Sequence, residues 1–221
     1  MDICLKALLM FFAALAVVGA MLFVPAGTLE YWQAWAYMAV VFVPVVFVGI
    51  YFLAKDPAFI ERRFKMREKE KEQQLLVKLG GVIFAIGFLL PGLDRRFGWS
   101  SVPFELVLAA DAIVLLGYAL VFLVFKENSY AGRTIRVEKG QKVVATGPYS
   151  VVRHPMYAGT LLMYLATPIA LGSYVAIWPF LLMIPLLVYR IRNEEKVLKK
   201  GLKGYSGYCR KVKCRLVPGV W

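Results

Sequence analysis

The sequence contains one histidine and three cysteines among 221 residues. Cys4, Cys209 and Cys214 show neither the spacing of a disulfide framework nor that of a metal site. We therefore expect reduced thiols that face the cytosol, no disulfide and no metal. Carboxylates are also scarce, with 14 Asp and Glu against 27 Lys and Arg, for a net charge of +13.

Polar stretches long enough to form a soluble domain are absent as well. Hydrophobic residues make up 60% of the chain, and its mean hydropathy is +0.64. Because a helix of about 20 apolar residues crosses a bilayer, the sequence predicts a single-domain, all-α integral membrane protein with about six transmembrane helices. No small-residue cleavage site follows the first apolar run, so we expect an uncleaved helix rather than a signal peptide. The predicted spans are 5–26, 31–54, 75–92, 104–125, 155–172 and 174–189.

Basic residues are distributed very unevenly between the two ends of these predicted spans. All Lys and Arg except Arg95 and Arg96 lie in segments 1–6, 55–78, 126–153 and 190–221. The positive-inside rule then places both termini and these segments in the cytoplasm, where they attract anionic membrane lipids. Nucleic acid is excluded as a partner because the basic residues flank apolar runs and form no nucleic-acid-binding motif. The oligomeric state stays open.

The segment that precedes the last two apolar runs has a different pattern. Residues 134–138 alternate apolar and polar side chains, residues 142–146 are largely apolar, and the two segments flank a turn that contains Gly140, which predicts a short cytoplasmic β-hairpin. Residues 190–221 mix charged and aromatic side chains, which predicts an amphipathic tail rather than a disordered one. Asp111 lies inside the fourth span, and we favour a structural role for it over a functional one.

The histidine lies in the stretch Gly147-Pro148-Tyr149-Ser-Val-Val-Arg153-His154-Pro155-Met-Tyr157. Pro155 is suited to the first position of a helix, which places His154 at the helix N-terminus. Free backbone N–H groups and Arg153 at this position favour a bound anion. A capping histidine beside an arginine that reaches lipid headgroups explains these residues equally well.

An acidic pair follows the last apolar run, where the helix is expected to continue into the cytoplasm. Arg190 and Glu194 are four residues apart and can form an exposed ion pair. Alternatively, Glu194 or Glu195 faces a cationic cofactor or a ligand ammonium.

Together these motifs carry a family resemblance. The ordered set from Gly147 to Gly159, followed by Arg192-Asn-Glu194-Glu195, Leu198, Tyr205, Tyr208 and Arg215-Leu-Val-Pro218, resembles the isoprenylcysteine carboxyl methyltransferase family and its bacterial relatives. The resemblance divides the single domain 1–221 into scaffold helices at 1–125 and a cofactor-binding catalytic region at 126–221. It implies S-adenosyl-L-methionine at the cytoplasmic helix ends and a lipophilic or prenylated acceptor that enters from the bilayer. The residues it implies for cofactor binding are Asn128, Gly147, Pro148, Tyr149, Arg153, His154, Pro155, Tyr157, Tyr205 and Tyr208, and those for catalysis are Arg190, Arg192, Glu194 and Glu195.

Methyl transfer from a sulfonium needs positioning and a dry pocket more than acid–base groups. A carboxylate acceptor, as on a prenylated cysteine, needs no base and could be held by Arg190 or Arg192. A phospholipid amine or a small thiol would need a base. Two other classes stay open: a membrane enone or sterol reductase that uses NAD(P)H, and a lipid-binding membrane protein without activity.

Overall fold

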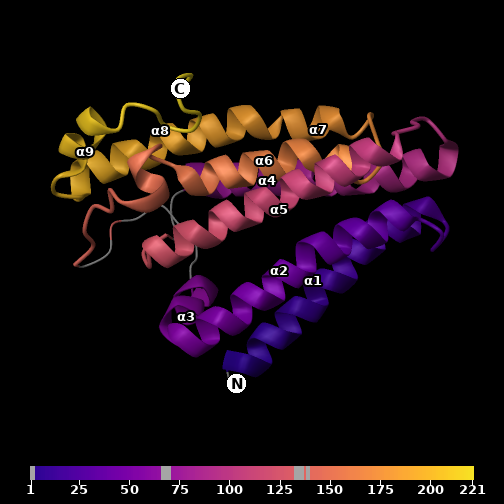
Figure 1. Ribbon diagram of the computed structural model, residues 1–221, viewed down its shortest axis with the longest axis horizontal. Coiled ribbons are helices and arrows are strands. Elements are labelled where there is room, and N and C mark those ends of the chain that lie inside the picture. The colour runs from indigo at the N-terminus through magenta and orange to yellow at the C-terminus, as the bar shows by residue number, and fades with distance from the viewer. Residues whose placement is uncertain (1–2, 66–70, 132–136, 138–139) are drawn as a thin grey trace.

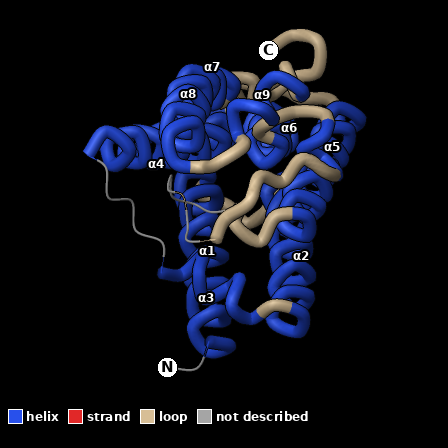
Figure 2. The backbone as a smooth tube through the Cα atoms, turned by 90° about the vertical axis from the view of Figure 1, so that its left-hand side faces the viewer, coloured by secondary structure: helices blue, strands red, loops and turns tan. Residues whose placement is uncertain are grey.

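The computed structural model describes residues 3–65, 71–131, 137 and 140–221, and within these ranges every regular element is a helix (Figures 1 and 2). The all-α prediction is confirmed. The elements are α1 (Ile3–Ala26), α2 (Trp32–Lys55), α3 (Pro57–Lys65), α4 (Lys71–Phe97), α5 (Phe104–Glu127), the 3₁₀ helix η1 (Gly147–Ser150), α6 (Pro155–Ala170), α7 (Ile177–Leu181), α8 (Met183–Gly201) and α9 (Tyr205–Lys211).

Four described helices are long and apolar enough to cross a membrane: α1, α2, the part of α4 from Gln73, and α5. The prediction of six spans is not supported. Helix α6 has 16 residues, which corresponds to about 24 Å at 1.5 Å per residue, short of the roughly 30 Å of a bilayer core. The predicted sixth span is interrupted at Leu182, between α7 and α8. Apolar composition could not reveal this break.

The predicted β-hairpin is not supported either. Residues 142–146 of its second arm have no strand structure and lead directly into η1. Most of its first arm, 134–136 and 138, lies outside the described residues. Alternation of apolar and polar residues is a weak signal over five residues, and the apolar side chains of Val143 and Val144 line a cavity instead.

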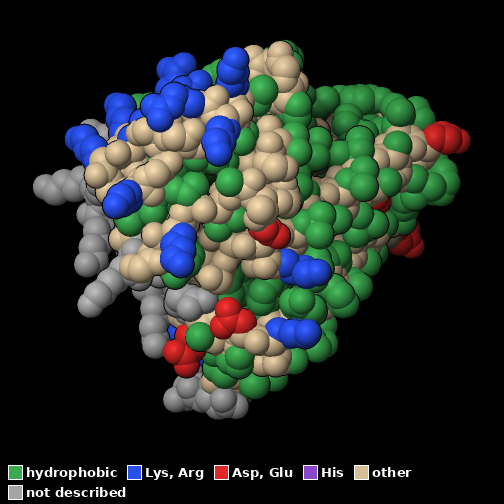
Figure 3. Space-filling view, turned by 60° about the vertical axis from the view of Figure 1, so that its left-hand side comes forward, with side chains coloured by type: hydrophobic (Ala, Val, Ile, Leu, Met, Phe, Trp, Pro, Cys, Tyr) green, Lys and Arg blue, Asp and Glu red, His purple; other side chains and the backbone are tan. Residues whose placement is uncertain are grey.

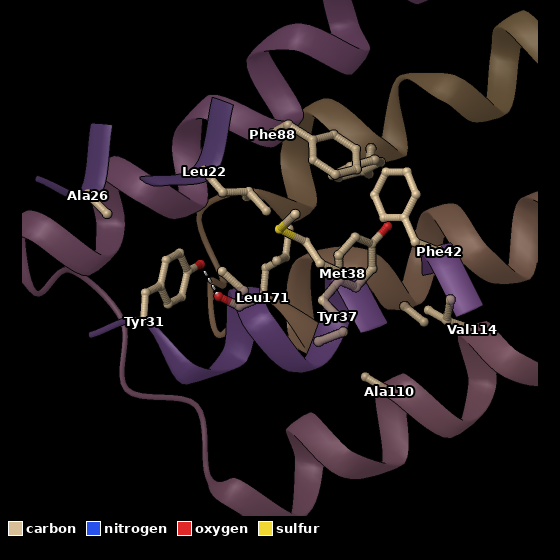
Figure 4. Packing of buried hydrophobic residues seen from close by; sticks show 14 residues of the cluster. Leu22, Ala26, Tyr31, Tyr37, Met38, Phe42, Phe88, Ala110, Val114 and Leu171 are labelled. Atoms are coloured by element: carbon tan, nitrogen blue, oxygen red, sulfur yellow. Dashed lines mark hydrogen bonds between the residues drawn. The ribbon is translucent and has the colours of Figure 1, made fainter. Parts of the chain in front are cut away.

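A buried core joins α1, α2, α4, α5 and α6 (Figure 4). The Tyr31 hydroxyl donates to the Leu171 carbonyl oxygen over 2.5 Å, and the hydroxyls of Tyr37 and Thr167 lie 2.9 Å apart. Tyr31 directly precedes α2 and Leu171 directly follows α6, while Tyr37 and Thr167 lie within these two helices. Both pairs therefore join α2 to α6. Polar side chains therefore fix the orientation of α6, which carries the motif at its N-terminus.

Glycine allows α5 and α6 to approach closely. A Cβ atom on Gly159 would lie 2.8 Å from the Gly117 carbonyl oxygen, and one on Gly117 would lie 2.8 Å from the Gly159 carbonyl oxygen. Gly92 does the same for α4, where a Cβ would lie 2.5 Å from the Leu22 carbonyl oxygen on α1. Small residues at helix crossings are typical of membrane proteins, because close backbone approach maximises packing in lipid.

Two carboxylates are buried away from the histidine motif. Asp94 accepts hydrogen bonds from the Ser100 hydroxyl over 2.6 Å and the Ser173 hydroxyl over 2.5 Å, so it ties the end of α4 to the turn after α6. Asp111 is buried on α5, and its Oδ1 has no hydrogen-bond partner among the described residues.

Charge gathers at one end of the described molecule. Figure 3 shows Lys and Arg side chains crowded at one end of the visible face, while hydrophobic side chains cover most of the rest. Exposed hydrophobic residues are numerous on α1, α2, α4 and α5. Such a surface requires an apolar solvent, so these helices are those of a membrane protein.

Candidate active site

The motif folds as a 3₁₀ turn, a short extended link and a helix start. Gly147 opens η1 with φ of 55°, and a side chain there would lie 3.1 Å from the Glu127 carboxylate at the end of α5. Pro155 occupies the first turn of α6 and His154 precedes it as N-cap, so this prediction is confirmed. The backbone N–H groups of Arg153 and His154 donate to the carbonyl oxygens of Cys214 and Arg215. The C-terminal segment thus holds the helix start in place.

Glu195 lies at the centre of a buried charge cluster. Its Oε1 accepts from Arg153 Nε over 2.7 Å, and its Oε2 accepts from Arg215 Nε over 3.1 Å. Burial alone would raise the pKa of Glu195, but His154 and the two arginines outweigh burial and lower it to about 2. Arg153 also donates to the Val212 carbonyl oxygen. Glu195 therefore joins α8 to the α6 start and to the C-terminal segment.

Glu194 belongs to a second, more open group. Its Oε2 accepts from the Tyr157 hydroxyl over 2.8 Å, and the same hydroxyl accepts from Arg190 Nε over 2.9 Å. The Glu194 side chain is 25% exposed, against 4% for Glu195. The Tyr157 hydroxyl on α6 thus joins Glu194 and Arg190, the two residues of α8 that were predicted to pair.

These residues surround a polar cavity at the basic end of the helices. Its wall includes side chains from the end of α5, η1, the start of α6, the end of α8 and α9. The Tyr208 hydroxyl donates to the Tyr149 carbonyl oxygen, and the Asn128 amide donates to the Tyr149 hydroxyl. Burial raises the pKa of Tyr149 to about 12. The tyrosines of the wall are therefore neutral hydrogen-bonding groups near pH 7.

A second, larger cavity of about 600 Å³ adjoins the polar one and lies among α4, α5, α6 and α8. The two cavities share Met156 and Tyr157. Most of the second wall is apolar, including Phe84, Phe125 and Leu187, and Arg63 and Arg190 supply cations. A narrow polar chamber and a wide apolar one thus meet at Tyr157.

The structure brings together most of the predicted site. The residues that line the polar cavity are Asn128, Tyr149, Arg153, His154, Pro155, Tyr157, Glu194, Tyr205 and Tyr208, and Arg190 lines the neighbouring apolar cavity. Gly147 and Pro148 do not line it, because they turn the chain against α5. Arg192 is exposed and lines neither cavity. Glu195 is also absent from both walls, and Glu194 is the member of the acidic pair that lines the polar cavity.

Sequence reasoning missed the rest of the wall. Tyr130, Ala131, Lys142, Val144, Met156 and Leu202 also line the polar cavity. Leu202 follows α8 directly and lies within the tail that was predicted to be amphipathic. No sequence signal marked residues 141–144, because their part in the wall depends on how the loop folds back over α8 and α9.

Three comparisons place this site among known proteins. A family model described as phospholipid methyltransferase matches residues 106–203. The chain is 27% identical over 129 residues to protein-S-isoprenylcysteine O-methyltransferase B of Arabidopsis thaliana, which covers 55% of this chain and 61% of that protein. It is also 35% identical over 105 residues to delta(14)-sterol reductase TM7SF2 of Mus musculus, which covers 44% of this chain and 25% of that protein.

The resemblance to membrane methyltransferases inferred from the motif is therefore confirmed over residues 106–203. The chain spans less than two thirds of the length of the two relatives it matches. The matched segment begins inside α5 and ends just after α8, so α1 and α2 lie outside it.

The chemistry of the polar cavity fits S-adenosyl-L-methionine. Tyr205 Oη is buried without a hydrogen-bond partner among the described residues, and His154 Nε2 lies 3.5 Å from Glu195 Oε1, too far for a well-formed hydrogen bond. Both residues line the wall. Glu194 supplies a carboxylate for an ammonium, and the tyrosine rings supply flat apolar surfaces. The cavity volume of about 90 Å³ is smaller than the roughly 300–1,000 Å³ of usual ligand pockets, so its wall would have to widen to admit the whole cofactor.

Proposed function

We propose that this protein is a membrane methyltransferase that transfers the methyl group of S-adenosyl-L-methionine to a lipophilic or amphiphilic acceptor, most like the carboxylate of a prenylated cysteine. One observation carries the proposal: a polar cavity and an apolar cavity share Met156 and Tyr157. A reaction between a water-soluble cofactor and a membrane-borne acceptor needs two such chambers with a common boundary.

In the polar cavity, His154, Tyr205 and Glu194 would hold the cofactor. When bound, the cofactor supplies a methyl group on a sulfonium, whose positive charge disperses during an in-line displacement. The task of the protein is then to position both reactants and to exclude water. Glu194 is suited to the amino group of the cofactor because its carboxylate lies at the wall and is partly exposed.

In the apolar cavity, Arg190 would orient the acceptor. Its guanidinium donates to Tyr157 at the common boundary, and a guanidinium binds a carboxylate with parallel hydrogen bonds. The rest of the wall suits an isoprenoid or acyl chain. A carboxylate acceptor is already a nucleophile, so this arrangement needs no general base. This favours a prenylated cysteine over a phospholipid amine or a thiol.

A reductase that uses NAD(P)H is the second candidate, favoured by the 35% identity to the mouse sterol reductase. A dinucleotide carries at least two phosphates and calls for several cations. Of the described residues that line the polar cavity, Lys142 and Arg153 are cationic, and Arg153 is already paired with Glu195. This composition favours the sulfonium cofactor.

The membrane orientation is part of the same proposal. The basic segments adjoin one end of each long helix: the start of α1, the end of α2, the start of α4, the end of α5, the start of α6 and the end of α8. By the positive-inside rule, this end and the site face the cytoplasm. The rule holds equally for four or six spans, because each added helix pair returns to the same side.

Calorimetric titration of the purified protein tests the cofactor. We expect S-adenosylhomocysteine to bind and NADPH not to bind. Transfer of a labelled methyl group from S-adenosyl-L-methionine to N-acetyl-S-farnesylcysteine, compared with phosphatidylethanolamine, then tests the acceptor. Binding of NADPH without binding of S-adenosylhomocysteine would replace the proposal by the reductase, and failure to bind either would favour a lipid-binding protein.

A further inference from the structure

A third cavity lies outside the methyltransferase-like segment, between α1 and α2. Its volume is about 610 Å³, and α3 and Phe125 border it. Figure 1 shows α1 and α2 as a pair that diverges from the other helices toward the end where α3 lies. The wall runs from Cys4 to Ala14 on α1, which at 1.5 Å per residue is about 15 Å. This is half of the roughly 30 Å of a bilayer core, so the cavity has the depth of one leaflet.

Cations gather at the α3 end of this otherwise apolar cavity. Arg63 belongs to the wall, and its guanidinium packs on the Phe125 ring at 4.3 Å and on the Phe59 ring at 5.4 Å. The Lys6 ammonium lies 5.0 Å from the centroid of Phe64, which also belongs to the wall. A ligand that fills this cavity therefore has a long apolar part and meets two positive charges where it leaves the hydrocarbon.

We propose that this cavity binds one anionic phospholipid of the adjoining leaflet, with an acyl chain between α1 and α2 and the phosphate beside Lys6 and Arg63. The aromatic rings hold Arg63 in place, which reduces the entropy lost when it binds a phosphate. A zwitterionic lipid has the same chain but carries a compensating cation, so charge supplies the selectivity. Arg63 and Phe125 line both this cavity and the acceptor cavity, whereas the part between α1 and α2 is lined by residues of its own. The lipid site therefore adjoins the acceptor cavity, and it does not depend on the proposed methyl transfer.

The site also adjoins the cofactor cavity through Arg63. Its Nη1 donates to the Ala131 carbonyl oxygen over 3.0 Å, and Ala131 lines the polar cavity. A phosphate beside Arg63 would therefore act on the residue that holds the loop after α5. This contact gives the lipid a route to influence cofactor binding.

Native mass spectrometry of the purified full-length protein tests the site, with phosphatidylglycerol and phosphatidylcholine of identical chains added in excess. We expect one tightly retained phosphatidylglycerol and about tenfold weaker retention of phosphatidylcholine. Lys6→Gln and Arg63→Gln should each reduce the difference, whereas Lys203→Gln, an exposed lysine outside the cavity, should not. Equal retention of the two lipids would overturn the proposal.

Two glycines allow binding in this cavity to be distinguished from binding in the acceptor cavity. Gly49 lines the α1–α2 cavity, and Gly81 lines the acceptor cavity. A Cβ atom at either position would have no neighbour within 4 Å. Leucine at either position fills space and favours the helix. We expect Gly49→Leu to abolish the retained phosphatidylglycerol and Gly81→Leu to leave it. Loss in Gly81→Leu alone would show that the lipid occupies the acceptor cavity, and retention in both would show that it binds neither cavity.

Discussion

Arg153 and Glu195 form an ion pair that is withdrawn from solvent: Nε and Oε1 lie 2.7 Å apart, and the side chains are 6% and 4% exposed. The pair joins the start of α6 to α8, and Arg215 brings in the C-terminal segment. Glu194 and Glu195, the acidic pair on α8, therefore have different roles. Glu195 maintains the shape of the site, and Glu194 faces the cavity.

Removing the charge of Glu195 should destabilise the protein. Glu195→Gln leaves two arginines beside an uncharged side chain, and breaking a buried ion pair typically costs about 3–5 kcal/mol. Unfolding of the detergent-solubilised variant measures the loss. Glu194→Gln is the matched control, because its amide oxygen can still accept from Tyr157, and we expect a loss of only about 0.5–1.5 kcal/mol. Equal losses in the two variants would contradict this division of tasks.

The same exchange at Glu194 should affect ligand binding instead. A charge-assisted contact of about 1.5–3 kcal/mol corresponds to a decrease of roughly tenfold or more in affinity for S-adenosylhomocysteine. Calorimetry on the folded variant measures it, and Glu105→Gln, an exposed carboxylate at the other end of α5, serves as control. Unchanged affinity in Glu194→Gln would remove Glu194 from the cofactor site.

Stability should fall in acid through Glu195. Its pKa is lowered from 4.5 to about 2 in the folded protein, so the folded state holds fewer protons than the unfolded state between these values. The stabilisation, on the order of 3 kcal/mol, is complete above about pH 4.5 and is lost as the pH falls toward 2. Unfolding measured from pH 6 to pH 2 should show this slope, and Glu195→Gln should lack it. The same slope in the variant would assign it to other carboxylates.

A side chain at the α5–α6 crossing should be poorly tolerated. The Cβ of Gly159→Ala would lie 2.8 Å from the Gly117 carbonyl oxygen and 2.9 Å from Val121. Since both neighbours belong to α5, the helices must separate, and we expect a loss of about 1–3 kcal/mol in unfolding experiments. Gly81→Ala meets nothing within 4 Å and should be neutral or slightly stabilising. Similar behaviour of the two variants would indicate that α5 and α6 are less tightly packed.

The orientation can be measured by labelling. In a background that lacks Cys4, Cys209 and Cys214, a membrane-impermeant maleimide added to intact cells should modify Ser101→Cys but not Lys203→Cys. Permeabilised cells, in which both should react, are the control. Labelling of Lys203→Cys from outside would reverse the proposed orientation.

The sequence by itself predicted what depends on composition and local geometry. Apolar runs predicted α1, α2, α4 and α5, because the length of a span is set by the bilayer. Pro155 predicted the start of α6, because its fixed φ and missing N–H suit the first turn. The set from Gly147 to Tyr157 with Glu194 indicated a methyltransferase-like site, and the family match over residues 106–203 agrees.

Only the tertiary structure decided how those residues share their tasks. Neighbours in sequence on a helix point about 100° apart, so which of Glu194 and Glu195 faces a cavity depends on where α6 and the C-terminal segment pack. Arg153 and Arg215 donate hydrogen bonds to Glu195. Glu194 and Arg190 instead contact the Tyr157 hydroxyl, at the boundary between the two cavities. The break at Leu182 and the loop over the cavity likewise depend on contacts between distant segments, which no local pattern records.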